Sequence, residues 1–163
     1  MNFVRFVKRL FFTFITLLRI GSYRELPNVF GFTRLNKNTH LGNNVNFNGF
    51  RVYGSGEIKI GNNFHSGSGC FVISQVHNYK GQKLPYDESY TTKKITIEDN
   101  VWFGMNVSIL ANCIVGEGAI VQAGSVIVGD IPRLAIVGGN PARVFKYRDS
   151  LHYEKLKNAK SFH

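Results

Sequence analysis

One histidine, His77, opens a polar segment that separates two regular parts of the sequence. The segment reads HNYKGQKLPYDESYTTKKIT and ends just before Ile97. A free imidazole has a pKa of about 6.5, so it is mostly neutral at pH 7 and can accept a proton. Long irregular excursions from a regular scaffold often carry function. The excursion is therefore a candidate for function, and an imidazole at its start has the chemistry of a general base; the alternative is an ordinary histidine on a surface loop.

Two carboxylates lie in the same segment and can orient the imidazole. We expect Asp87 to play this part, with Glu88 as the alternative. Of the other histidines, two fall at positions of the regular pattern and are expected to be structural, and two lie in the C-terminal tail. In that order they are His40, His65, His152 and His163.

A six-residue repeat flanks this segment and must hold it in place. Counting in sixes from residue 97 meets an apolar side chain at every step, and the fifth place of each unit is mostly compact. The first column is Ile97, Phe103, Ile109, Val115, Val121 and Ile127, and the second is Val101, Val107, Cys113, Ala119, Ser125 and Ile131. The same phase appears before the segment, from about residue 41 to residue 76.

A period of six fits neither a helix nor a continuous strand, but it fits a short extended segment followed by a turn. Three units make a coil of roughly 18 residues with three flat sides, and like positions stack from coil to coil. The phase slips by one residue near Gly54 and Gly56. Several Gly and Asn residues at the corners are expected to adopt unusual backbone angles. They are Gly42, Asn43, Gly61, Asn62, Gly104, Gly116 and Gly118.

Composition places the chain among globular proteins. It has 163 residues, of which 44% are hydrophobic and 18% charged, and this balance argues against disorder. Two cysteines are too few for a disulfide framework or a Cys-rich zinc site, and they fit a reducing compartment. Both fall on the compact column, so Cys70 and Cys113 are expected to fill the core rather than act as nucleophiles. The sequence has no run of about 18 uncharged apolar residues, so a membrane-spanning helix is not expected.

The net charge of +10 is concentrated at both ends of the chain. Residues 1–37 carry seven Lys or Arg against Glu25 alone, and residues 143–163 carry six against two acidic side chains. Residues 38–142 are neutral overall. No nucleic-acid-binding motif accompanies this charge, so nucleic acid is not expected as a partner. An anionic cofactor, an anionic membrane surface, or both, would explain the pattern.

Three segments are expected: a basic amphipathic helix in residues 1–24, a repeat domain in residues 25–147 with its excursion at 77–96, and a short helix or tail in residues 148–163. In residues 3–20, apolar side chains recur at three- and four-residue steps, which predicts a helix. One interpretation is an interfacial helix whose Phe and Leu face meets lipid. The other is a helix packed on its own domain or on a partner subunit. A signal peptide is disfavoured, because RIGSYREL follows without a small-residue cleavage pattern.

Residues 100–146 contain the strings NVWFG, QAGSVI and GGNPARV. With the repeat, they make the sequence resemble the left-handed β-helix hexapeptide-repeat acyltransferases. It is most similar to the sugar and polysaccharide O-acetyltransferases, with galactoside and maltose acetyltransferases as related members. The resemblance covers about residues 41–147. It implies an all-β fold, a left-handed parallel β-helix, together with a homotrimer and acetyl-CoA as co-substrate without a metal. The implied acceptor is a hydroxyl of a sugar or of a surface-polysaccharide precursor.

The resemblance also implies the catalytic roles. His77 stands where the family has its catalytic histidine, just before an excursion from the helix. It would take the proton of the acceptor hydroxyl as the oxygen attacks the thioester. A main-chain N–H of the turn Gly104–Met105 would then stabilise the oxyanion.

The implied acetyl-CoA site lies beside residues 102–146. Trp102 would flank the pantetheine arm or the acceptor, backbone groups of Met105 and Ala123 would bind the pantetheine, and two cations would reach the CoA phosphates. The implied cofactor-binding residues are Trp102, Gly104, Met105, Ala123, Arg143 and Lys146. The alternatives are simple packing for Trp102 and ordinary solvated charge for the two cations.

Two positions depart from the family pattern. Many relatives have Asp directly before the histidine, where this chain has Val76, so the orienting partner of His77 stays open. Some relatives have a CoA-binding Lys where this chain has Gly129, so that contact is in doubt.

Other functions compete with O-acetyl transfer. One is a non-catalytic β-helix scaffold at the membrane, and another is an N-acetyltransferase acting on an amino sugar. A zinc-dependent γ-class carbonic anhydrase needs two histidines five residues apart, which neither His65 nor His77 provides. The expected location is the cytoplasm, with peripheral contact to the inner membrane face through the N-terminal helix.

Overall fold

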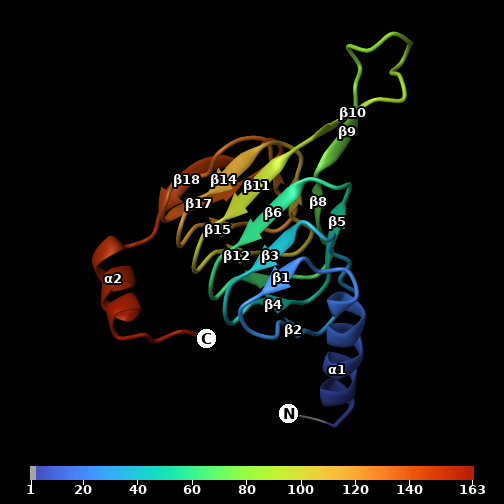
Figure 1. Ribbon diagram of the computed structural model, residues 1–163. Helices are drawn as coiled ribbons and strands as arrows, with labels where there is room; N and C mark the ends of the chain where they lie inside the picture. Colours follow the sequence, from blue (N-terminus) through green and yellow to red (C-terminus); the bar gives the residue numbers. More distant parts are fainter. Residues whose placement is uncertain (1–2) are drawn as a thin grey trace.

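The structure is a computed structural model that describes residues 3–163, and it shows a three-sided parallel β-helix between two terminal helices (Figure 1). The helices are α1 (Phe3–Leu17) and α2 (Ser150–Asn158). Face A consists of β1 (Ser22–Tyr23), β3 (Thr39–Leu41), β6 (Glu57–Ile60), β11 (Lys94–Ile97) and β14 (Cys113–Val115). Face B consists of β2 (Asn28–Val29), β4 (Asn46–Phe47), β7 (His65–Ser66), β12 (Trp102–Phe103), β15 (Ile120–Val121), β17 (Ala135–Gly138) and β18 (Arg143–Tyr147). Face C consists of β5 (Phe50–Tyr53), β8 (Cys70–Ile73), β13 (Ser108–Ile109) and β16 (Val126–Ile127).

Successive coils stack in register. In face B, Phe103 pairs in parallel with Ser66 of the coil before it and with Val121 of the coil after it. The last coil ends in an antiparallel pair, β17 with β18. The predicted fold class, a left-handed parallel β-helix of hexapeptide repeats with an N-terminal helix and a short C-terminal helix, is confirmed.

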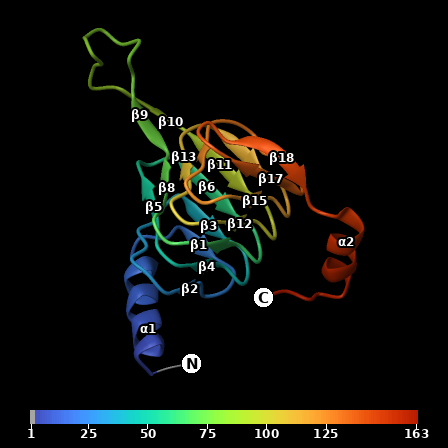
Figure 2. The ribbon, with the colours of Figure 1, turned by 180° about the vertical axis from the view of Figure 1, so that it is seen from behind.

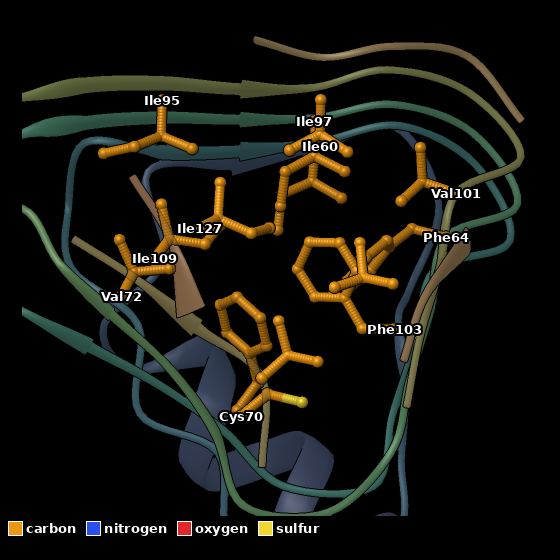
Figure 3. Packing of buried hydrophobic residues seen from close by; sticks show 14 of the residues in the cluster. Ile60, Phe64, Cys70, Val72, Ile95, Ile97, Val101, Phe103, Ile109 and Ile127 are labelled. Carbon is orange, nitrogen blue, oxygen red and sulfur yellow. The ribbon is translucent and has the colours of Figure 1, made fainter. Parts of the chain in front are cut away.

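Inward side chains fill the prism with one hydrophobic core. Every member of the two predicted columns is buried, which confirms the assignment of the period. Figure 3 shows Ile60 and Ile97 stacked from one coil to the next, above the rings of Phe64 and Phe103. Those two rings meet edge to face with centroids 5.2 Å apart, a favourable aromatic arrangement. Both cysteines are buried within the same core, as expected.

Asparagines at one corner adopt the left-handed backbone region. Asn44, Asn63 and Asn100 have φ of 51°, 55° and 60°. Their side chains form a ladder along the corner: the amide of Asn44 donates to Asn63 Oδ1 at 3.0 Å, and the amide of Asn63 donates to Asn100 Oδ1 at 2.8 Å. Asn tolerates this backbone region because its short amide can bond locally.

The expectation that seven named corner residues adopt unusual angles was wrong for all but Gly118, which has φ +70°. The other glycines are needed for close approach between coils. A Cβ on Gly61, for example, would lie 2.3 Å from Asp99 Oδ1 and 2.8 Å from the Asp99 backbone nitrogen. The correction applies to Gly42, Asn43, Gly61, Asn62, Gly104 and Gly116.

The predicted phase slip is confirmed. Ser22 pairs with His40, 18 positions on, whereas Thr39 pairs with Ile58, 19 positions on. Gly54, between these coils, has φ +92°, a conformation that suits glycine and accommodates the extra residue.

The polar segment leaves the prism as an arm built on the antiparallel strands β9 (Gln75–His77) and β10 (Tyr90–Thr92) (Figures 1 and 2). The arm spans residues 75–92 rather than the predicted 77–96, because Lys94–Ile97 form β11 of face A. At its base, the N–H of Lys93 donates to the carbonyl of Ser74 at 2.8 Å. The chain therefore rejoins face A at Lys94, beside the point where it left face C, and the register of the coils is kept.

The element boundaries differ slightly from the predicted segments. Helix α1 ends at Leu17, and Ser22 and Tyr23 already pair with β3, so the prism begins before residue 25. Strand β18 ends at Tyr147, and α2 follows it. Met1 and Asn2 of the predicted first segment lie outside the described residues.

Candidate active site

His77 lies at the base of the arm with its ring against two tyrosines. Its centroid is 3.8 Å from that of Tyr86, with 19° between the planes, and 4.6 Å from that of Tyr90, its partner in the strand register. The imidazole is exposed. The two phenol rings restrict its orientation while leaving it accessible to a reactant, which is what a general base needs.

Asp87 holds the arm loop together. Its carboxylate accepts hydrogen bonds from the Gln82 N–H at 2.9 Å, from the Ser89 N–H at 2.9 Å and from the Ser89 hydroxyl at 2.5 Å. The bond from the Ser89 hydroxyl and those from the backbone lower the pKa of the Asp87 carboxyl. Across residues 3–163 these bonds all come from its own loop, so the predicted pairing of Asp87 with His77 stays a prediction. Glu88 pairs with Lys83 at 2.6 Å.

The predicted oxyanion turn follows β12 on face B. The N–H of Gly104 already donates to the carbonyl of Val121 at 2.8 Å. Among the hydrogen bonds of residues 3–163, none is donated by the N–H of Met105, so Met105 is the candidate donor of this turn. Its side chain is 54% exposed, as is that of Trp102.

The predicted cofactor residues gather along face B. Ala123 is exposed in the coil after Met105, and a Cβ on Gly104 would lie 2.6 Å from the Ala123 backbone nitrogen, so glycine is required between the coils. Arg143 and Lys146 extend the same sheet on β18, opposite Gly138 and Ile136, and both are exposed. The structure therefore brings all six predicted cofactor residues to face B or to the turns that follow its strands.

The predicted catalytic and cofactor-binding residues occupy different parts of one chain. The arm leaves between the last strand residue of face C and the first of face A, whereas Trp102 lies on face B. Within the described residues, no ring contact or hydrogen bond joins His77 to Trp102.

A pocket of about 430 Å³ lies below Trp102, between face B and the C-terminal segment. His65, in the preceding coil, is the residue that pairs with Trp102 in the sheet register. Its ring stacks on that of His163, with the ring centroids 5.3 Å apart. Burial, and then the charge of His163, lower the pKa of His65. The pocket lining comprises Asn46, Asn63, His65, Asn100, Val101, Trp102, Arg148, Tyr153, Leu156, Lys157, Ser161, Phe162 and His163.

Helix α2 is held beside the pocket by one acidic side chain of the prism. Glu117 accepts hydrogen bonds from the Tyr153 hydroxyl at 2.7 Å and from the Lys157 ammonium at 2.5 Å. Burial alone would raise the pKa of the Glu117 carboxyl, but these two donors hold it below its usual value. Arg133 adds an ion pair to Glu154 on α2. The C-terminal wall of the pocket is therefore fastened to the prism by charge-assisted bonds.

Sequence reasoning missed two features of this region. His65 was expected to be structural and His163 to belong to the tail, yet they meet in the pocket. The outward position that His65 shares with Trp102 was a usable signal once the register was known. The contact between His77 and Tyr86 had no such signal, because the arm follows no period.

Within residues 3–163, no group of three His, Cys, Asp or Glu side chains is arranged to hold a metal ion. Neither helix of the described chain has the length and apolar character needed to cross a bilayer.

Residues 94–129 match the family model described as bacterial transferase hexapeptide (six repeats). The crystal structure of the hexapeptide-repeat acetyltransferase VCA0836 of Vibrio cholerae, in complex with acetyl coenzyme A, aligns with a TM-score of 0.62 at 25% identity. The alignment covers 78% of this chain and 70% of that one. Over this part of its length, the chain is therefore similar to the hexapeptide-repeat acyltransferases.

Curated relatives match this chain over part of their length. YvoF of Bacillus subtilis, whose name assigns it provisionally to the acetyltransferases, is 32% identical over 103 residues, which is 63% of this chain and 55% of YvoF. The 2,3,4,5-tetrahydropyridine-2,6-dicarboxylate N-acetyltransferase of Staphylococcus aureus is 36% identical over 86 residues, which is 53% of this chain and 31% of that enzyme. The matched region thus spans about half of the first relative and about a third of the second.

Proposed function

We propose that this protein transfers an acetyl group from acetyl-CoA to a hydroxyl of a sugar or of a surface-polysaccharide precursor. The observation that carries the proposal is the position of His77. It is an exposed imidazole, restrained by two tyrosine rings, on an arm of a prism whose relative VCA0836 was crystallised with acetyl coenzyme A. The predicted cofactor-binding residues of face B offer exposed apolar and cationic side chains, which suit the pantetheine arm and the phosphates of acetyl-CoA.

In the proposed reaction, the neutral imidazole of His77 accepts the proton of the acceptor hydroxyl as its oxygen bonds to the acetyl carbonyl carbon. A hydroxyl is too weak an acid to ionise first, so the two events are concerted. The N–H of Met105 stabilises the oxyanion of the tetrahedral intermediate. The carbon–sulfur bond then breaks, and the CoA sulfur receives the proton from the imidazolium, which returns the base to its neutral form.

Arg143 and Lys146 would pair with the CoA phosphates, which suits two exposed cations on the edge strand β18. Trp102 and Met105 would border the pantetheine arm. Since these residues lie on face B and His77 on the arm, we propose that two copies of the chain form each site, as in the homotrimer that the family resemblance implies.

An amine acceptor is the second candidate. It is favoured by the 36% identity to an N-acetyltransferase over 86 residues. The two products differ chemically, because hydroxylamine cleaves an O-acetyl ester and leaves an N-acetyl amide intact. The products formed from sugar and amino-sugar acceptors should therefore be treated with hydroxylamine. Their masses, measured by mass spectrometry, then distinguish transfer to a hydroxyl from transfer to an amine.

The test of the base is the rate of CoA release from acetyl-CoA with sugar acceptors. His77→Ala should lower the rate by about a hundredfold or more, the usual effect of losing a general base. His40→Ala, which removes an exposed histidine of face A, is the matched control and should leave the rate unchanged. A rate for His77→Ala within about threefold of wild type would overturn the assignment.

Mixed assemblies test whether two copies form each site. His77→Ala and Trp102→Ala are each expected to be inactive alone. Co-expressed in equal amounts, they should recover about a quarter of wild-type activity, because some interfaces then combine an intact arm with an intact face B. No recovery in assemblies shown to be mixed would place both halves of the site in one chain.

A further inference from the structure

Helix α1 presents a continuous apolar face to solvent. At 100° per residue, six large side chains fall on one side of the helix or just beyond its end, and each is between 46% and 78% exposed. They are Phe3, Val7, Leu10, Phe11, Phe14 and Leu18. Exposed patches of this kind on a soluble domain usually mark an interaction surface.

The opposite face of α1 is fixed to the first coils, so the apolar face cannot roll inward. Thr16 is buried; its hydroxyl donates to the carbonyl of Phe12 in the same helix at 2.8 Å, and the carbonyl oxygen of Thr33 lies 3.3 Å from the same hydroxyl oxygen. The guanidinium of Arg9 donates to Asn28 Oδ1 at 3.0 Å. Phe12 packs against the core. Turning the apolar face toward the prism would break these contacts.

The charge around α1 is strongly positive. Residues 1–37 hold seven Lys or Arg and one acid, Glu25, whose carboxylate already accepts the N–H of Asn44 at 3.0 Å. Lys8 is exposed on α1 and Arg19 is exposed just beyond its C-terminal end, while the Arg5 guanidinium lies 4.9 Å above the ring of Phe30. An apolar face bordered by cations matches the boundary between anionic headgroups and acyl chains.

We propose that α1 lies in the surface of an anionic lipid bilayer, with its apolar face in the acyl boundary and Lys8 and Arg19 among the headgroups. Charge decides between this partner and a second copy of the chain. Two copies of residues 1–37 would bring two strongly positive segments together, which is unfavourable, whereas anionic lipid neutralises both.

In both views α1 extends from the first coils at the lower end of the prism, and the arm projects from its upper end (Figures 1 and 2). The proposal is independent of the catalytic role of His77.

Flotation with vesicles tests the proposal. The probes are phosphatidylcholine vesicles with about 30% phosphatidylglycerol and vesicles of phosphatidylcholine alone. Wild-type protein should bind the anionic vesicles and be released as salt rises to about 0.5 M. The double variant Leu10→Asp, Phe14→Asp should bind at least tenfold more weakly, because two inserted apolar side chains become charged. Leu151→Asp, on an 84% exposed leucine of α2, is the matched control and should bind like wild type.

Charge reversal separates the electrostatic attraction to the headgroups from the insertion of apolar side chains. Lys8→Glu with Arg19→Glu should weaken binding to the anionic vesicles and leave binding to neutral vesicles unchanged. Where the double Asp variant fails to fold, the dependence of wild-type binding on lipid charge and salt still decides. The proposal is overturned if wild-type protein does not bind anionic vesicles, or if folded Leu10→Asp, Phe14→Asp binds them like wild type. It is also overturned if those substitutions dissociate an oligomer without lipid binding, since α1 is then a contact between copies.

Discussion

The ring of His77 lies nearly parallel to the ring of Tyr86, with centroids 3.8 Å apart. This is a contact between the first part of the arm and its tip loop, and it fixes which way the imidazole faces. A stacked phenol adds no charge and donates no proton to the imidazole nitrogens in this geometry, so Tyr86 acts as a positioning residue.

Replacing Tyr86 tests that positioning role. Tyr86→Ala should lower kcat about tenfold and leave the KM for acetyl-CoA unchanged, because misorientation of a base affects the chemical step. Tyr86→Phe keeps the ring and should restore the rate. Steady-state kinetics of both variants check this, and an equal loss in the two would show that the hydroxyl matters instead of the stacking.

Asn63 is the middle rung of the corner ladder, so its replacement should be costly. Asn63→Ala removes two side-chain hydrogen bonds and leaves an alanine at φ 55°, which together should lower the free energy of unfolding by about 2–3 kcal/mol. Denaturant unfolding measures the loss. Asn63→Gly removes the same bonds without the backbone strain, so a loss as large as that of alanine would contradict the role of the left-handed corner.

The stacked pair His65 and His163 should make the C-terminal segment sensitive to pH. Burial and the neighbouring imidazole lower the pKa of His65, so docking favours its neutral form. The docked state is therefore stable above the ordinary histidine pKa of about 6.5 and loses stability as the pH falls below it. The chain has one tryptophan, Trp102, and it lines the same pocket, so its fluorescence should report the opening.

Two variants check the source of this pH response. His65→Phe keeps an aromatic ring without the titrating group and should abolish the fluorescence change. His152→Ala removes an exposed histidine of α2 and should leave it intact. A response that survives His65→Phe unchanged but vanishes in His152→Ala would assign the titration to α2.

Both thiols should resist alkylation in the native protein. Burial, followed by the charge of Asp130, raises the pKa of Cys113 to about 12, and burial raises the pKa of Cys70. Thiolates are the reactive species, so iodoacetamide at about pH 8 should modify neither residue until denaturant is added. Mass spectrometry of the intact protein counts the adducts, and rapid native labelling would mean that the core opens locally at these coils.

The core could be predicted from sequence because the six-residue period determines which side chains point inward. Ile97 and Val121, four units apart, must both point inward if every sixth residue does, and both are buried. The corners were less predictable. A glycine such as Gly61 and an asparagine such as Asn63 both mark a corner in the pattern, but the first serves close approach and the second a left-handed backbone. Composition alone does not separate these reasons.

The candidate site was predictable in its parts and not in its arrangement. The resemblance named His77 and Trp102, but their separation depends on which corner of the prism releases the arm, and the arm leaves between face C and face A. The pocket depends on α2 folding back through Tyr153 to Glu117, a contact between positions 36 apart with no shared pattern.

The bond between Lys93 and Ser74 closes the arm at its root. Since the prism on either side keeps its register, an arm of another length or sequence could be grafted there without disturbing any layer of the core. The sequence of the arm and the folding of the scaffold are thus separable properties. A lineage of such proteins can vary its arm while inheriting one unchanged framework.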